Sequence, residues 1–147
     1  MKRLLAVICL GLMMADSSWA ENPVPQPDTR HMSTKQLQTL ILSQSKSTPG
    51  KIYVKARMLA TPSQEVMRKY YPVAAKATGQ KGVALLECQF DQMGNLVNCE
   101  SLAEEPQAFG FGAATITLAQ KYFTLDMRDL HADSNNKWVK IMLCWPN

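Results

Sequence analysis

The sequence of 147 residues lacks the motifs that assign a chain to a common class of enzyme. It has no Cys-x-x-Cys redox motif, no glycine-rich phosphate loop and no motif of a serine or cysteine nucleophile. Its two histidines are isolated, so they do not complete a zinc site of familiar spacing. We therefore expect a protein that is not an enzyme and that holds no metal or cofactor.

The chain also lacks an apolar run of the about 20 residues that a membrane-spanning helix needs. Its apolar run near the N-terminus, residues 4–15, follows a basic start and precedes a Ser-Trp-Ala tripeptide. These features are typical of a secretory signal peptide over residues 1–20, cleaved between Ala20 and Glu21. An uncleaved membrane anchor is the alternative. We expect an exported protein with no stable membrane span after cleavage.

Length and charge set further limits. A chain of this length has room for one domain and one core. Its net charge is +4, and the predicted signal removes two basic residues and one acidic residue, which leaves +3. The basic residues are scattered, whereas a nucleic-acid surface needs them clustered with exposed aromatic residues. No nucleic-acid partner is indicated.

The first part of the mature chain is predicted to lie outside the main domain. Residues 21–32 carry prolines at alternate positions, which predicts a short, stiff leader. Residues 33–70 are predicted to form an N-terminal extension of three elements. These are a helix from Ser33 or Thr34 to Leu42, a strand over Lys51–Leu59, and a helix capped by Thr61 that ends near Tyr70.

Residues 71–147 are predicted to form the main domain. Its elements are a helix over residues 72–78, strands over Gly82–Phe90 and Leu96–Leu102, a helix over residues 112–123, a loop over residues 124–136, and a closing strand over Lys137–Trp145. A turn around Gly94 joins the first two strands into a hairpin. The fold class is α+β: an antiparallel sheet of about three strands, with two helices on one face.

Alternation of side chains predicts which residues share a face. We expect Cys88 to lie opposite Cys99, so that Phe90 faces Val97. This register places the following residues on one apolar sheet face: Ala84, Leu86, Cys88, Phe90, Val97 and Cys99. On the second helix, the residues expected on the sheet are Ile116, Ala119, Tyr122 and Phe123. The closing strand alternates strictly, with Val139, Ile141 and Leu143 on one face and Lys140, Met142 and Cys144 on the other.

The order of these elements resembles the C-terminal domain of the TonB protein family. The matching positions are a Tyr-Pro-x-x-Ala helix start, a glycine that opens the first strand, a glycine in the turn, a cysteine on each hairpin strand, a Glu-Glu-Pro break and a Gly-Phe-Gly stretch: Tyr71, Pro72, Ala75, Gly82, Gly94, Cys88, Cys99, Glu104–Pro106 and Gly110–Gly112. The resemblance covers about half of the chain. It implies a non-enzymatic protein–protein interaction module in the periplasm of a Gram-negative bacterium, related to TonB-dependent transport.

The resemblance also implies how a partner binds. Members of this family add a strand of the partner to an exposed sheet edge, and some dimerise by strand exchange. The closing strand is the candidate edge here, through Val139, Ile141 and Leu143. The other interpretation is that Lys137 and Lys140 merely protect this edge.

Two other functions stay open. A TonB energy transducer has an uncleaved membrane anchor and a long proline-rich spacer. The leader of this chain would reach only about 37 Å as a polyproline helix. A membrane-anchored transducer is therefore the runner-up. From a different class, the alternative is a small periplasmic thiol enzyme that uses Cys144.

Three cysteines remain after the predicted cleavage. In an exported protein an even pair usually forms a disulfide. We expect Cys88 and Cys99 to be bridged, since they lie at opposed strand positions; a redox pair and a metal pair are the other interpretations. Cys144 is expected to be a free, buried thiol, and a bridge from it to one of the other two is the competitor.

The remaining candidates are expected to be structural. Glu104 and Glu105 suggest paired catalytic carboxylates, but they adjoin Pro106 and are expected in a solvated loop. Asp91 is expected to brace the hairpin turn. The glycines of Gly110–Gly112 are expected to allow close packing of a helix on the sheet.

Overall fold

The structure is a computed structural model that describes residues 28–130 and 136–146. Within these ranges the fold is α+β, with a mixed four-stranded sheet, a separate two-stranded sheet and four α-helices. The elements are η1 (Thr29–His31), α1 (Thr34–Gln44), β1 (Ile52–Tyr53), β2 (Met58–Ala60), α2 (Gln64–Lys69), α3 (Val73–Thr78), β3 (Gly82–Phe90), β4 (Leu96–Glu105), α4 (Phe111–Tyr122), β5 (Thr124–Leu125), η2 (Met127–Asp129) and β6 (Lys137–Trp145). The predicted signal and most of the leader lie outside the described residues. No helix in the described ranges is long and apolar enough to cross a membrane.

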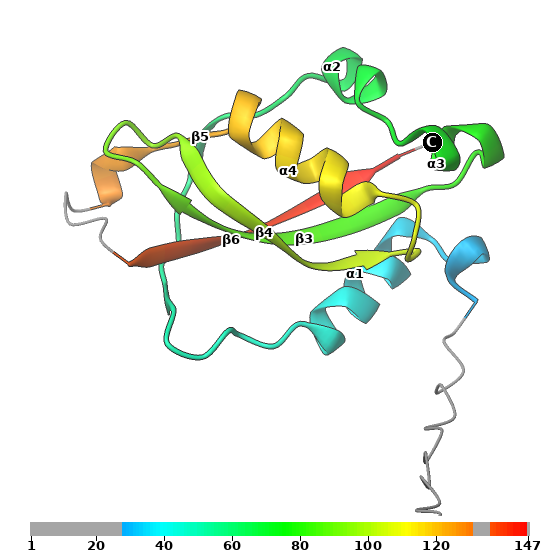
Figure 1. The fold of residues 1–147 in the computed structure, drawn as a ribbon, viewed down its shortest axis with the longest axis horizontal. Helices are drawn as coiled ribbons and strands as arrows, with labels where there is room; N and C mark the ends of the chain where they lie inside the picture. The colour runs from blue at the N-terminus through cyan, green and yellow to red at the C-terminus, as the bar shows by residue number, and fades with distance from the viewer. Residues whose placement is uncertain (1–27, 131–135, 147) are drawn as a thin grey trace, which may run out of the picture.

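The main sheet has the strand order β1-β6-β3-β4 (Figure 1). The central strand β3 pairs antiparallel with β4 and β6, as predicted, but β1 adds a fourth strand that is parallel to β6. The strand predicted over residues 51–59 is divided in two. After Tyr53 the chain leaves β6, and Met58 pairs instead with Leu125 in the small β2–β5 sheet.

Helices cover both faces of the main sheet (Figure 1). Helix α4 packs on β3 and β4 from one side, and α1 packs on the same strands from the other. The prediction placed helices on one face only. The apolar run over residues 83–86 carries the signal for a second covered face, because a strand buried on both faces shows no alternation. Residues 33–70 thus supply α1 and β1 to the layers of the main fold.

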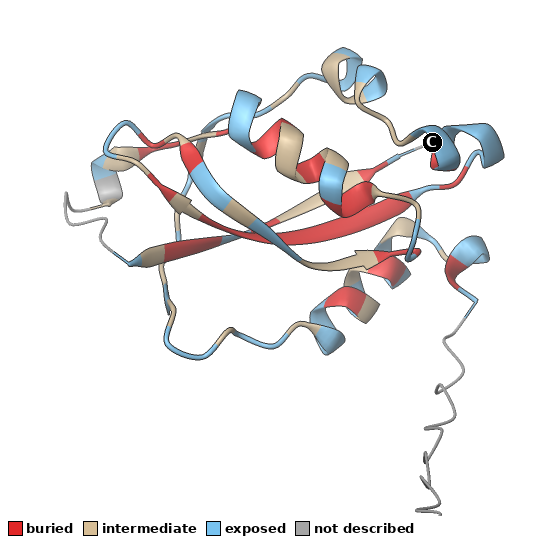
Figure 2. Cartoon of the chain, in the orientation of Figure 1, coloured by how far each residue is buried: buried red, intermediate tan, exposed pale blue. Residues whose placement is uncertain are grey.

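The two faces have separate cores (Figure 2). The smaller core, under α1, contains Leu37, Ile41, Val83 and Leu85, with Met142 and Cys144 packed against it. The larger core, under α4, contains Leu86, Cys88, Phe90, Phe111, Leu118, Val139, Ile141 and Trp145. The two faces of β6 therefore divide as its alternation predicts.

An aromatic cluster holds one end of the α4 core. Trp145 is fully buried, and its Nε1 donates a hydrogen bond to Thr115 Oγ1 at 2.8 Å. Tyr71 and Phe111 lie beside the Trp145 ring, with ring centroids 5.6 and 6.1 Å away. A Cβ atom on Gly82 would come within 2.2 Å of the Phe111 ring, so this position of β3 admits no side chain.

Helix α4 packs slightly differently from the prediction. Its buried residues are Phe111, Gly112, Thr115, Leu118 and Ala119. Of the residues expected on the sheet, Ala119 and Phe123 are buried, whereas Ile116 and Tyr122 are only half-buried. The close packing expected at the Gly-Phe-Gly stretch is confirmed, because a Cβ atom on Gly112 would lie 2.4 Å from Ser101 Oγ.

The hairpin turn follows the prediction, but the register beside it does not. Asp91 Oδ1 accepts the backbone N–H groups of Met93 and Asn95, each at 2.9 Å, which braces the turn as expected. Phe90 pairs with Leu96 rather than with Val97. A bulge in β4 near Asn98, whose φ is 47°, inserts one residue into the ladder. Leu96 is consequently buried, and Val97 is exposed.

Capping sets the bounds of the short helices. Helix α2 begins two residues later than predicted because Ser63, not Thr61, is its cap; Ser63 Oγ accepts from the N–H of Val66 at 3.3 Å. Helix α3 ends at Gly79, whose φ of 62° is in the left-handed region that favours glycine. The short turn from α2 into α3 at Pro72 places Tyr71 over the end of β6.

Candidate functional site

The disulfide joins the two hairpin cysteines, as predicted. Cys88 and Cys99 are bonded, and their Cα atoms lie 4.1 Å apart. Cys88 is fully buried in the α4 core. Cys144 is free and half-buried under α1, where its Sγ accepts a hydrogen bond from Gln38 Nε2 at 2.8 Å.

The closing strand β6 has an outer edge that is paired only at its start. Strand β1 pairs with Lys137 and Trp138, and the N–H of Val54 donates to the Trp138 carbonyl at 2.9 Å. From residue 140 onward, no strand in the described ranges pairs with this outer edge. This is the strand that the sequence indicated as the candidate edge.

The outward backbone groups of β6 belong to the residues between those named from the sequence. Backbone groups alternate in direction along a strand. Because the Trp138 carbonyl points to β1, the outward N–H and C=O groups further along are those of Lys140, Met142 and Cys144. The backbone N–H and C=O groups of Val139, Ile141 and Leu143 instead point toward β3, and their side chains enter the α4 core. Side-chain alternation predicted the faces correctly but says nothing of this in-plane direction.

A groove lies where the open part of the edge begins. It is formed by the segment that leaves β1, including Val54, Lys55 and Met58, and by Val139 and Lys140 of β6. Lys140 is exposed; its Nζ donates to Ser47 Oγ at 3.1 Å. Strand β1 does not extend past this point, so the groove leaves room for another strand beside the outer edge of β6.

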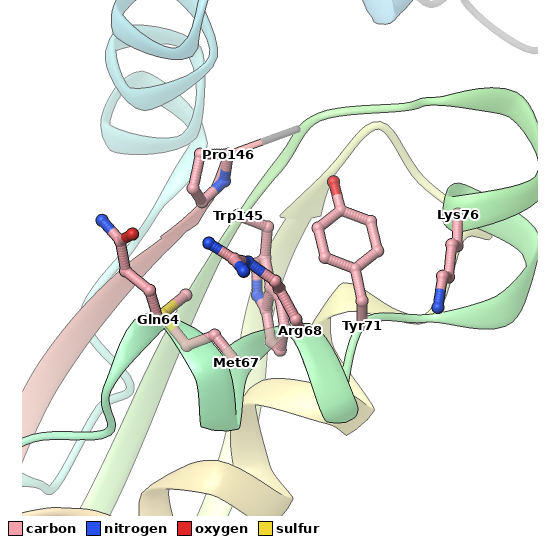
Figure 3. A pocket seen from close by; sticks show the side chains of 7 residues that line it. All are labelled: Gln64, Met67, Arg68, Tyr71, Lys76, Trp145 and Pro146. Atoms are coloured by element: carbon pink, nitrogen blue, oxygen red, sulfur yellow. The ribbon is translucent and has the colours of Figure 1, made fainter.

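A second cavity lies at the other end of the edge (Figure 3). It has a volume of about 410 Å³ and is lined by Gln64, Met67, Arg68, Tyr71, Lys76, Trp145 and Pro146. Trp145 forms its floor and is itself fully buried. Tyr71 donates its hydroxyl hydrogen to the Gln80 carbonyl at 2.7 Å, and burial raises the pKa of this phenol. Sequence reasoning missed the cavity because its walls come from residues 64–76 and from residues 145–146, which meet only in the fold.

The start of the edge is anchored by a buried carboxylate. Glu87 of β3 is 1% exposed, and it accepts hydrogen bonds from Lys51, from Tyr53 Oη at 2.5 Å and from Thr48 Oγ1 at 3.0 Å. Lys51 Nζ also lies 3.5 Å from the centroid of the Trp138 ring. Burial opposes ionisation of Glu87, but the hydrogen bonds outweigh it and lower the pKa. This network fixes β1 beside β6.

The two glutamates before Pro106 are not in a solvated loop. Strand β4 extends through Glu105, which is buried and whose carboxylate is hydrogen-bonded by Thr29 of η1. Glu104 is half-buried, and its carboxylate accepts the backbone N–H groups of Gly110 and Gly112 at 3.3 and 2.5 Å, where α4 begins. The carboxylates therefore have different surroundings, and one of them caps a helix.

Replacing Glu105 with glutamine is expected to stabilise the fold at neutral pH. Burial, assisted by the charge of Glu104, raises the pKa of Glu105, while hydrogen bonds from Thr29 and Gln107 oppose the rise. A raised folded-state pKa means that stability is complete below the unfolded-state pKa, about 4.3, and is lost as the pH rises through the folded value. E105Q avoids this loss. Urea unfolding from pH 4 to pH 8 measures the difference, which should grow with pH.

The neighbouring carboxylate supplies the control for this prediction. E104Q removes the negative charge that accepts the N–H groups of Gly110 and Gly112. It should therefore lower the free energy of unfolding by about 1 kcal/mol at neutral pH. An E105Q variant that is less stable than the wild type at pH 8 would show that the charge of Glu105 is required.

Comparison with known proteins found no family model and no curated protein that matches this chain. In the described part of the chain, no three His, Cys, Asp or Glu side chains come together as a metal site would require. The chemistry that the β6 edge offers is that of binding: backbone donors and acceptors, apolar walls and two cations at one end.

Proposed function

We propose that this chain is a non-enzymatic protein–protein interaction module of the TonB C-terminal type, which acts in the periplasm. It binds its partner by adding a strand of that partner to the outer edge of β6. The observation that carries this proposal is the row of outward backbone groups at Lys140, Met142 and Cys144, for which no strand of the described ranges provides a partner.

Strand β1 supports the same proposal. It already occupies the start of this edge, in parallel, over two residues. A partner strand would continue in the position that β1 leaves, where main-chain hydrogen bonds supply affinity and alternate side chains supply selectivity. The bridged cysteines favour an oxidising compartment, which agrees with the predicted signal peptide. A relation to TonB-dependent transport is part of the proposal.

Replacing Met142 with proline is expected to weaken partner binding about tenfold or more. Proline removes the outward N–H of this residue and places a ring methylene where a partner carbonyl would lie. The fold should persist, since alternation from the Trp138 carbonyl directs this N–H away from β3. M142A is the matched control for the lost side chain. Binding is measured by cross-linking in a periplasmic extract and by titration with the partner so captured.

Hydrogen exchange provides an independent measurement. In the free protein, the amides of Lys140, Met142 and Cys144 should exchange fast, and those of Ile141 and Leu143 should exchange slowly. The partner should protect the fast set. Equal binding by M142P and M142A, with the fast amides unprotected, would rule out strand addition at this edge. Protection that appears only at high protein concentration would identify a second copy of the chain as the partner.

A further inference from the structure

The cavity at the end of β6 is lined by two cationic side chains that form no ion pair with the described residues. Arg68 of α2 and Lys76 of α3 line it, and their side chains stand on either side of the Tyr71 ring in Figure 3. Neither forms an ion pair with a carboxylate of the described residues, and no acidic side chain lines the cavity. The neighbouring Lys69, by contrast, pairs with Glu65 at 3.2 Å and lies outside the lining.

The rest of the lining is largely apolar and partly accessible. Met67 and Tyr71 are half-buried, Pro146 is exposed, and Trp145 closes the floor. A volume of about 410 Å³ is in the range of sites that hold a small ligand or one side chain with its backbone. The chemistry that fits is a carboxylate attached to an apolar group, because a planar guanidinium binds a carboxylate through two hydrogen bonds.

The position of the cavity relates it to the β6 edge. Strand β6 runs toward it: Trp145 is the last residue of the strand and Pro146 follows. A partner strand parallel to β6 would therefore bring its C-terminal end to the cavity. An antiparallel strand would bring its N-terminal end, and a terminal ammonium beside Arg68 and Lys76 would be repelled. Parallel pairing is also the orientation that β1 uses at this edge.

We infer that the cavity binds the C-terminal carboxylate of the partner strand, with an apolar last side chain against Met67, Tyr71 and Pro146. The inference rests on the proposed strand addition and specifies its partner: a polypeptide whose chain ends in an extended segment, lies parallel to β6 and finishes with an aliphatic or aromatic residue. Arg68 and Lys76 are the residues that select the free terminus.

The test uses short peptides and the mature chain. About seven residues, at about 3.3 Å each, cover the edge from Lys140 to Pro146. The probe is a pool of N-acetylated heptapeptides of alternating threonine and valine that end in leucine, phenylalanine, valine or methionine. Each is made with a free C-terminal carboxylate and as the C-terminal amide. The Trp145 indole N–H signal reports on the cavity, and the Trp138 indole at the start of β6 is the reference.

The expected result is a preference for the free acids. They should shift the Trp145 signal, protect the outer amides of β6, and bind about tenfold or more tightly than the amides. R68Q and K76Q should each remove this preference without changing the weaker binding of the amides. K69Q, next to Arg68 but outside the cavity, should bind like the wild type.

Several results would overturn the inference, and they separate it from the proposed function. Equal binding of acid and amide, with the outer amides protected, rejects the terminal carboxylate and keeps strand addition. If binding depends on the carboxylate but is the same in M142P as in the wild type, strand addition is rejected, and with it a partner strand. If decanoate, an apolar acid without a peptide, binds as tightly as the peptides and R68Q weakens this binding, the cavity is assigned to a free apolar acid. No binding by any member of the pool at millimolar concentration rejects the proposed partner.

Discussion

Replacing Glu87 with alanine is expected to lower the free energy of unfolding by about 3 kcal/mol. The substitution leaves Lys51 beneath Trp138 without its buried partner and removes the acceptor of Tyr53 Oη and Thr48 Oγ1. Lys51 keeps its contact with the exposed Glu100, so the loss arises mainly because the ammonium and the two hydroxyl groups lose a buried acceptor. Urea unfolding measures the loss. Exchange of the Val54 amide, which donates to Trp138, should show that β1 detaches first.

Glu100 provides the matched control for Glu87. It also contacts Lys51, at 3.0 Å, but its side chain is 64% exposed. E100A should therefore cost less than about 1 kcal/mol. A loss of similar size in both variants would show that burial of Glu87 is not what makes its ion pair important.

The pH dependence gives a second check on Glu87. Its folded-state pKa is lowered, so its contribution is present above the unfolded-state pKa, about 4.3, and is lost as the pH falls through the folded value. The difference between the wild type and E87A should consequently narrow below about pH 4. Glu105, with its raised pKa, has the opposite sign.

Removing the disulfide with the double substitution C88A/C99A is expected to cost about 3 kcal/mol. The two cysteines are 11 residues apart, and the bridge restricts this loop in the unfolded chain, which lowers the entropy gained on unfolding. Truncation of the fully buried Cys88 adds a packing loss. Urea unfolding of the variant, beside the wild type with and without reductant, separates the two contributions.

The third cysteine is the control for this prediction. C144A should leave the sensitivity to reductant unchanged, because Cys144 is a free thiol that only accepts a hydrogen bond from Gln38. Mass spectrometry of tryptic peptides without reduction should find Cys88 linked to Cys99. A Cys88–Cys144 peptide, or a wild type whose stability is indifferent to reductant, would contradict the bridge.

Where local chemistry decides the structure, the sequence was a good guide. The hairpin turn follows from an aspartate that accepts two backbone N–H groups and a glycine with a φ of 83°. Gly79 ends α3 for the same kind of reason. The two faces of β6 follow from alternation over nine residues. Each of these features depends on residues close together in the chain, so the local sequence is sufficient to predict it.

Features that depend on distant segments were missed. The alternation of β4 predicted Val97 on the buried face, but the bulge near Asn98 shifts the ladder and buries Leu96 instead. Glu105 was expected in solvent because it precedes a proline, yet it is buried and hydrogen-bonded by Thr29 of η1. In the candidate site, the strand was identified from its pattern. The cavity was not, because α2, Tyr71, Lys76 and the end of β6 meet only in the fold.

The amino-acid sequence by itself determined the elements of the hairpin, the cysteine pair, the approximate bounds of α3 and α4, and the faces of β6. Only the tertiary structure decided that α1 covers the second face, that β1 pairs in parallel with β6, and that Glu87 is buried among groups from residues 48–53. The physical reason is that a side-chain pattern records which face of an element is buried. Contacts between distant segments decide which element covers that face and which backbone edge remains unpaired.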